Sequence, residues 1–385
     1  MNQAVIAGYV RTPFHFARKG ALSGVRPDNL AAVALQGLVN RTGIDPASIE
    51  DVLLGCAYPE AEQGNNIARI AVLLAGLPIS VSGMTVNRFC GSSMSAIHIA
   101  AGQIALGAGE AFVCGGVESM TRVPQGGFNF SANPKFKRPD MPAAELMTEA
   151  YISMGETAEN VAAQFGVSRA DQEKLAFASQ QKAASAQAAG KLAGEIVGVM
   201  TAEGLVDSDG CIRPQTSLEG LAGLKPAFRP DGTVTAGTAS PLTDGASAVL
   251  VCTEAYARSN GLDVLARVRA IASAGCPPEI MGMGPVPATL KALARAGLTI
   301  DDIDVVEINE AFGSQAVACL RELGIAEEKV NLDGGGISIG HPLGATGARI
   351  TGKAALLLKR EGGRFALSTQ CIGGGQGVAT ILEAV

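Results

Sequence analysis

Cys90 is the residue of this sequence best suited to covalent chemistry. It ends a short apolar run that begins at Met84, and the small residues Gly91, Ser92 and Ser93 follow it. The pattern predicts a strand that turns into a helix at Cys90, where free backbone N–H groups and the helix dipole favour a thiolate. We therefore expect a nucleophilic cysteine. The alternative for a single cysteine is a small buried apolar residue, and the other motifs have to decide between the two.

The candidate base for this cysteine is one of only three histidines. His15 lies in a polar loop segment, and His98 lies inside the helix predicted after Cys90, where we expect it to be packed. His341 stands in the run Gly340-His341-Pro342 just before a further predicted helix, among glycines that let the backbone approach a ligand closely. By elimination, the base for Cys90 is expected to be His341.

Two other predicted strand ends carry side chains of chemical interest. Cys371 follows an apolar run and precedes a flexible glycine turn, which begins at Gly373 and is rich in N–H donors. Asn309 also stands at the end of a predicted strand, where its amide could orient a water or a carbonyl group. Asparagine at such a position is commonly only a turn former, so Asn309 alone indicates little.

The elements that must position these residues are those of an α/β protein. A chain of 385 residues with 47% hydrophobic content is too long for one ordinary single-core domain, so two or three domains are expected. The 49 glycines, the absence of tryptophan and the few aromatic residues are typical of many tight strand–helix turns and closely packed helices.

Charge and cysteine usage exclude several classes of protein. The net charge of −6 argues against nucleic-acid binding. The eight cysteines form no CxxC pair and have no histidine at metal-ligand spacing, so we expect no disulfides, no metal site and a reducing compartment. The first residues run into a strand without a basic flank or cleavage site, and no apolar run is expected to reach membrane-spanning length. These features predict a cytoplasmic protein without a membrane span.

The chain divides into two regular parts around an irregular insertion. Residues 1–119 alternate predicted strands and helices, and residues 243–263 are expected to complete this first half. Residues 120–242 are rich in proline, glycine and basic side chains and predict an inserted loop domain. Residues 264–385 return to regular alternation and form the second half.

The two halves also resemble each other. The stretch from Gly297 to Val306 repeats the pattern from Gly43 to Val52, with glycine, isoleucine and valine in register and a helix before each. We also align Phe365-Ala366-Leu367 before Cys371 with Phe112-Val113 before Cys114. In two similar packed halves the corresponding strand ends lie near one another, which is where ligands bind to such sheets. Cys90, His341 and Cys371 are therefore expected to converge.

Taken together, the motifs resemble those of the thiolase family, and the resemblance extends from the first strand to Val385. The motifs that carry it occur in the family's order: Asn87-Arg88-Phe89-Cys90-Gly91-Ser92-Ser93-Met94, Gly232 to Ser240 with Asp244-Gly245-Ala246, Asn309-Glu310-Ala311-Phe312, Gly340-His341-Pro342-Leu343-Gly344 and Cys371-Ile372-Gly373-Gly374-Gly375-Gln376-Gly377. The Cys90 motif and the run that starts at Met281 look most like the degradative 3-ketoacyl-CoA thiolases. The resemblance implies a duplicated five-layer α-β-α-β-α core with an inserted loop domain that binds coenzyme A.

The catalytic roles implied by the resemblance fall on five residues. Cys90 is the nucleophile, His341 its activator, and Cys371 the acid and base that exchanges a proton with the α-carbon of acetyl-CoA. The backbone amides of Cys90 and Gly373 form one oxyanion hole, and His341 with a water held by Asn309 forms a second. The implied reaction is the cleavage of 3-ketoacyl-CoA by CoA through an acyl-Cys90 intermediate, as in fatty-acid β-oxidation.

The resemblance also implies the partners of the protein. Its coenzyme A contacts are Met154, Arg213, Phe228, Ala236, Ser240 and Phe312. Coenzyme A is a substrate, and no tightly bound cofactor and no metal are implied. The assembly is a homodimer or homotetramer, or a subunit of a multienzyme β-oxidation complex.

Several departures from the family leave substrate choice open. Ser153, Thr238 and Pro241 stand where many relatives have His, Asn and Gly. They lie on the coenzyme and acyl side, so an acetoacetyl-CoA or 3-oxoadipyl-CoA substrate remains an alternative. A ketoacyl synthase-like condensing enzyme is a more remote one, since it lacks the second cysteine in this setting, and a non-catalytic acyl-CoA-binding protein is expected to have lost one of the catalytic residues.

Overall fold

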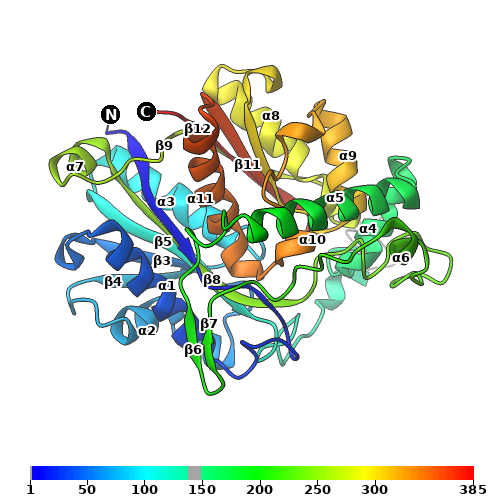
Figure 1. Cartoon of the computed structure of the whole chain (residues 1–385), viewed down its shortest axis with the longest axis horizontal. Coiled ribbons are helices and arrows are strands. Elements are labelled where there is room, and N and C mark those ends of the chain that lie inside the picture. Colours follow the sequence, from blue (N-terminus) through cyan, green and yellow to red (C-terminus); the bar gives the residue numbers. More distant parts are fainter. Residues whose placement is uncertain (1, 138–148) are drawn as a thin grey trace.

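The computed structural model describes residues 2–137 and 149–385, and its centre is one large mixed sheet (Figure 1). The order of the paired strands is β10-β11-β12-β9-β1-β8-β5-β3-β4, with the short β2 paired to β8. These strands are β1 (Ala4–Arg11), β2 (His15–Phe16), β3 (Asp51–Gly55), β4 (Ser82–Val86), β5 (Ala111–Ser119), β8 (Thr243–Thr253), β9 (Ala266–Gly275), β10 (Val305–Ile308), β11 (Phe365–Ile372) and β12 (Gln376–Glu383). The strands β5 and β8 are buried along their whole length, which fits the mostly apolar sequence of β5. The strand β8 also buries polar side chains, among them Asp244 and Ser247.

The sheet contains the expected internal repeat. From its middle outwards, one half reads β1-β8-β5-β3 and the other reads β9-β12-β11-β10, and β3–β5 and β10–β11 are the matching parallel pairs. The segments before β3 and β10 both start at a left-handed glycine, Gly43 with φ 68° and Gly297 with φ 71°, which ends the preceding helix. The predicted duplication is thus confirmed in the order and direction of the strands.

One detail of the predicted alignment is wrong. In the matching parallel pairs, Val52 lies opposite Val113 and Val306 lies opposite Leu367. Cys114, the next residue along β5, therefore corresponds to Ser368 rather than to Cys371. Cys371 lies three residues farther along β11, at the end of the strand where the candidate site is located.

Helices cover the sheet in the layers expected of the family. The helices α1 (Pro27–Thr42) and α2 (Ile67–Leu74) pack outside the first half, and α8 (Pro285–Ala296) and α9 (Gly313–Leu323) pack outside the second. The helices α3 (Ser92–Leu106) and α11 (Leu343–Glu361) pack against each other and against strands of both halves. Apolar clusters lie on both sides of this central helix pair, which gives the five layers.

The expectation that no apolar run reaches membrane-spanning length is wrong in one place. Within the described part of the chain, Phe89–Leu106 is long and apolar enough to cross a membrane by length and composition. In the structure this run consists mostly of α3, which lies in the core against α11 and β5. Its apolar character is therefore explained by burial inside the protein.

The inserted segment lies to one side of the sheet (Figure 1). Its elements are α4 (Met154–Gln164), α5 (Arg169–Ala188), the hairpin of β6 (Val199–Thr201) and β7 (Gly204–Val206), and α6 (Leu218–Ala222). Two further short helices complete the chain, α7 (Glu254–Ser259) and α10 (Gly336–Ile339). After the insertion the chain returns through β8, which lies between β1 and β5. The domain boundaries at 119, 242 and 263 stay predictions.

Candidate active site

Cys90 lies in a tight turn between β4 and α3. The preceding residue, Phe89, has a φ of 42°, a left-handed conformation that is strained for a side chain of its size. The turn is held by Asn87, whose Oδ1 accepts from the Phe89 N–H at 2.9 Å, and by Ser92, whose hydroxyl donates to the Phe89 carbonyl at 2.5 Å. The predicted strand–turn–helix at Cys90 is confirmed, and strain at this position is typical of a functional site.

The end of β11 meets this turn. Gln370 donates a side-chain hydrogen bond to the Cys90 carbonyl. The backbone N–H of Gly373 faces the Cys90 sulfur and lowers its pKa. Cys371 is almost fully buried, and a charge on Cys90 raises its pKa, so the two sulfurs lie within electrostatic reach. Cys90, Cys371 and Gly373 therefore form one group.

The expectation of a stabilised thiolate at Cys90 is wrong for the unliganded site. Burial raises the Cys90 pKa to about 11, against the opposing effect of the Gly373 and Cys90 amides. The negative charge of Glu118 raises this pKa further. Burial also raises the pKa of Cys371 well above its ordinary range. Both cysteines are thus thiols at neutral pH.

Asn309 and His341 form a second group. Asn309 follows β10, and its backbone N–H donates to the Thr369 carbonyl in β11 at 3.0 Å, which places it beside the strand that carries Cys371. The Asn309 amide nitrogen lies 3.3 Å from Nε2 of His341, and Nδ1 of His341 lies 2.6 Å from the hydroxyl of Thr346. Thr346 in turn donates to the Pro342 carbonyl at 2.9 Å. Because Thr346 donates its own proton to Pro342, its oxygen accepts from the Nδ1–H group of His341. The Nε2 atom of His341 is then unprotonated, and its lone pair faces the Asn309 amide nitrogen.

The His341 ring is a neutral base in this structure. Burial lowers its pKa to about 3, and the positive charge of Arg349 contributes in the same direction. His98, the other histidine near Cys90 in sequence, lies 2.8 Å from the Thr380 hydroxyl on the far side of α3. Its packing agrees with the expectation from the sequence.

Glu118 connects the two groups, and the sequence analysis did not identify it. Its buried carboxylate accepts hydrogen bonds from the backbone of Ala57 at 2.8 Å and of Gly344 at 2.9 Å, and from the Gln63 side chain at 2.7 Å. Gly344 lies in the first turn of α11, three residues after His341. The one available signal was a charged residue near the end of the otherwise apolar strand β5. The sequence did not point to Thr346 or Gln370 either.

The predicted coenzyme A contacts gather beside Cys371, with one exception. Met154, Phe312 and Cys371 share an apolar cluster, and Phe228 packs edge-on against Phe312 with ring centroids 5.9 Å apart. Ser240 donates from its hydroxyl to the Ala311 carbonyl at 3.0 Å, and Ala236 is exposed on the same segment. Arg213 instead lies over the Phe16 ring, 5.0 Å from its centroid.

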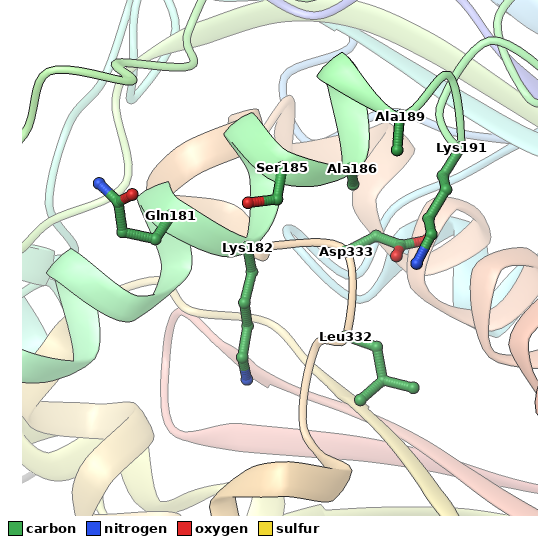
Figure 2. A pocket seen from close by; sticks show the side chains of 8 residues that line it. All are labelled: Gln181, Lys182, Ser185, Ala186, Ala189, Lys191, Leu332 and Asp333. Atoms are coloured by element: carbon green, nitrogen blue, oxygen red, sulfur yellow. The ribbon is translucent and has the colours of Figure 1, made fainter.

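A separate hollow lies away from these groups. It has a volume of about 410 Å³ and is bordered by α5 and by Leu332 and Asp333 (Figure 2). None of the predicted site residues lines it. Among the residues that the structure describes, no group of three or more His, Cys, Asp or Glu side chains could hold a metal ion.

Comparison with known proteins defines the family. The chain matches the thiolase N-terminal domain over residues 4–255 and the thiolase C-terminal domain over residues 262–384. A 3-ketoacyl-CoA thiolase from Pseudoalteromonas translucida is 47% identical over 395 residues, and one from Bacillus subtilis is 46% identical over 396 residues, with complete coverage of both chains in each case. The crystal structure of the Bacillus anthracis acetyl-CoA acetyltransferase superimposes with a TM-score of 0.89 at 38% identity, covering 100% of this chain and 99% of that one.

These matches define an enzyme of the thiolase class. The chain belongs to the thiolase family, as the sequence motifs predicted, and the predicted thiolase fold is confirmed.

Proposed function

We propose that this thiolase cleaves 3-ketoacyl-CoA with CoA to give acetyl-CoA and an acyl-CoA shortened by two carbons. The observation that supports the proposal is a pair of free thiols, the partly buried Cys90 and the buried Cys371, near the Gly373 amide. Asn309, which contacts His341, is hydrogen-bonded to the strand that carries Cys371. A retro-Claisen cleavage needs a nucleophile that forms a good thioester and a separate acid for the departing carbanion. Two cysteines in one site meet both needs.

The first half-reaction uses Cys90 and His341. The neutral imidazole takes the Cys90 proton, and the sulfur attacks the C3 ketone of the substrate. The developing oxyanion accepts hydrogen bonds from the Cys90 and Gly373 amides. The C2–C3 bond then breaks, which leaves the shortened acyl group on Cys90 and the electron pair on C2 of the departing acetyl-CoA.

Asn309 and His341 stabilise the carbanion. Its charge is delocalised onto the thioester oxygen, which faces the protonated His341 and a water held by Asn309. The Asn309 Oδ1 atom is buried without a hydrogen-bond partner among the described residues, so it is free to accept from such a water. Cys371 gives its proton to C2 and releases acetyl-CoA. CoA then gives its thiol proton to the Cys371 thiolate and attacks the acyl-Cys90 thioester. The shortened acyl-CoA forms, and the departing Cys90 sulfur takes back the proton held by His341.

Coenzyme A is proposed to lie along the cluster beside Cys371. Met154 and Phe312 would contact the pantetheine chain, and Ser240 would hydrogen-bond a pantetheine amide. Phe228, Ala236 and Arg213 would border the nucleotide part, where an exposed guanidinium suits phosphate or adenine. CoA acts as a substrate, and the proposed chemistry needs no tightly bound cofactor.

The assembly is proposed to be a homodimer or homotetramer, alone or within a multienzyme β-oxidation complex. The edge strand β4 supports this, because Met84 on it and Leu73, Leu74 and Ile79 beside it are exposed apolar side chains. The proposed compartment is the cytoplasm, since the eight cysteines are all free and a cysteine nucleophile requires a reducing environment.

The function is tested by mixing the protein with a 3-ketoacyl-CoA without free CoA and mapping the adduct by mass spectrometry. We expect an acyl group on Cys90 and the release of acetyl-CoA. A panel of chain lengths, from acetoacetyl-CoA upwards, identifies the preferred substrate. An adduct on Cys371, or no acetyl-CoA, would contradict the proposal.

A further inference from the structure

A strip of aromatic side chains leads from the nucleophile to the surface. It consists of Phe89, Tyr58, Phe130, Tyr151 and Phe136, and we call it the aromatic strip. Phe89 and Tyr58 have ring centroids 6.0 Å apart, Phe130 and Tyr151 5.4 Å, and Tyr151 and Phe136 5.5 Å. The two parts meet at Gly126, whose backbone faces the Tyr58 hydroxyl and whose Cβ position lies 4.0 Å from Cβ of Phe130.

The inner end of the strip adjoins the reacting cysteine. Phe89 directly precedes Cys90, and its left-handed φ of 42° is held by hydrogen bonds of the turn. A Cβ placed on Gly373 would lie 3.4 Å from the Met154 sulfur and 3.8 Å from the Phe89 ring. Met154, a proposed pantetheine contact, and the first ring of the strip therefore both lie close to Gly373. Burial raises the Tyr58 pKa to about 12, and a charge on Cys90 adds to this effect, so the second ring also lies near the sulfur.

Hydrogen bonds hold the backbone at Tyr58 and before Phe130, whereas the rings of Phe89, Phe130 and Tyr151 are exposed. The Tyr58 carbonyl accepts from the Gln63 side chain at 2.7 Å, and its N–H donates to the Glu118 carboxylate. Glu60 accepts from the Phe128 N–H at 2.8 Å and anchors the loop that carries Phe130. Yet Phe89 is 38% exposed and Phe130 is 60% exposed. Exposed aromatic rings on an anchored backbone are typical of a surface that binds an apolar ligand.

We propose that the aromatic strip binds the alkyl chain of long-chain 3-ketoacyl-CoA substrates and that Tyr58 and Phe130 determine chain-length preference. This inference rests on the proposed function, because the chain it accommodates is the one transferred to Cys90. The occupant follows from continuity: an acyl group on Cys90 starts next to Phe89, whose ring contacts Tyr58 of the strip. The proposed coenzyme contacts Phe312 and Phe228 belong instead to the cluster around Cys371. A longer chain covers more of the strip, and each buried methylene improves binding by up to about fourfold.

The test compares two substrates, acetoacetyl-CoA and 3-ketododecanoyl-CoA, in the wild type and in Phe130→Ala. Phe130 is exposed, so its truncation leaves the core intact. We expect the ratio of kcat/KM for the long over the short substrate to fall about tenfold, mainly through KM, which corresponds to roughly 55 Å² of lost apolar contact. Phe130→Leu should restore most of the ratio. Leu205→Ala, a truncation of an exposed apolar side chain on β7, is the matched control and should not change it.

A binding measurement separates this inference from the proposed function. In a Cys90→Ala background, calorimetric titration should show tighter binding of dodecanoyl-CoA than of acetyl-CoA, and Phe130→Ala or Tyr58→Leu should abolish most of the difference. This result would support binding of the alkyl chain by the aromatic strip even if no thiolysis occurs. Equal chain-length ratios and equal affinities in wild type and variants would overturn the inference. A changed oligomeric state of Phe130→Ala with an unchanged ratio of kcat/KM would show that Phe130 lies in a subunit contact instead. This outcome would overturn the inference as well.

Discussion

The reacting side chains are all uncharged in the free site. Burial holds the Cys90 thiol at a pKa of about 11 and the His341 imidazole at a pKa of about 3. A thiolate–imidazolium pair is therefore disfavoured before substrate enters. The same burial strengthens every hydrogen bond to an oxyanion that forms later, since water is excluded and the local dielectric is low. The site therefore holds no reactive thiolate at rest, but it strongly stabilises the charge that develops during the reaction.

The pH dependence of Cys90 alkylation follows from this. In His341→Ala, the rate of reaction with iodoacetamide should rise by about tenfold per pH unit from pH 7 to pH 10, because the reactive thiolate fraction grows toward a pKa of about 11. In the wild type, the neutral imidazole removes the proton during attack and adds a rate that changes little with pH, so the wild type should react faster near neutral pH and show a shallower slope. The two rates should converge near pH 11. Peptide mapping by mass spectrometry measures the rate at Cys90 itself.

Cys276 provides the internal control for that experiment. It is half-buried, and burial raises its pKa to about 11 as well, but its sulfur contacts the Met281 carbonyl at 3.9 Å rather than His341. Its alkylation should be the same in both proteins. A plateau of the Cys90 rate in His341→Ala already at pH 7 would show a preformed thiolate and contradict the assignment of charges.

At the scale of elements, the first turn of α11 aligns the base. His341 directly precedes this helix, Thr346 within it contacts Nδ1, and Gly344 donates to the Glu118 carboxylate on β5. Glu118 also accepts from the segment before α2, so a single carboxylate fixes the start of α11 relative to the first half of the sheet. The orientation of the imidazole thus depends on contacts between both halves.

Thr346→Val tests this alignment with little change of volume. The ring loses its Nδ1 partner, and we expect kcat to fall by about 10- to 100-fold, part of what a general base contributes. KM for CoA should stay within about twofold, since Thr346 lies on the far side of the ring. Thr346→Ser restores the hydroxyl and should restore kcat. Equal losses in the Ser and Val variants would mean that Thr346 acts through packing rather than through Nδ1.

The sequence predicted the helices and strands well, and the contacts between residues far apart in the sequence poorly. The strands and the helix starts near Cys90 and His341 follow local patterns of apolar, glycine and proline residues, and the repeat of Gly43 to Val52 at Gly297 is visible without coordinates. Cys371 was paired with the wrong residue because strand register depends on the partner strand. Glu118 was missed because its donors come from segments far away in sequence. The thiolate at Cys90 was wrongly predicted because the cost of burial outweighs the local amides.

At the scale of the whole molecule, a buried ion network joins three parts of the chain. Arg11 on β1 contacts Glu195 at 2.8 Å and Asp209 at 2.6 Å, both in the inserted segment. Lys353 on α11 contacts Glu195 at 2.8 Å and Asp333 at 2.7 Å. Burial alone would raise the Glu195 pKa, but Lys353 and Arg11 outweigh it and hold this pKa below its ordinary value. The network ties the inserted segment to both halves of the sheet.

Glu195→Ala should therefore destabilise the whole fold. Two buried cations lose their shared partner, which costs about 3–5 kcal/mol at pH 7. Because the folded-state pKa of Glu195 is lowered, its contribution is fully present above the ordinary carboxyl pKa. It is lost as the pH falls through the lowered folded-state pKa, so wild type and variant should converge only in stronger acid. Urea unfolding at pH 7 and at a series of pH values below the ordinary carboxyl pKa measures both. Asp263→Ala removes an exposed partner of Lys359 and should change stability by less than about 1 kcal/mol.

The central claim is that the two cysteines handle different bonds, Cys90 the acyl transfer and Cys371 the proton at the α-carbon. The most direct test is the exchange of methyl protons of acetyl-CoA in deuterated water, followed by NMR, together with a count of acetylated Cys90 by mass spectrometry. The wild type should wash deuterium into the methyl group. Cys371→Ala should still acetylate Cys90, because that transfer forms no carbanion, but should show no exchange. Equal deuterium uptake in both proteins would contradict the account and assign the proton transfer to another group.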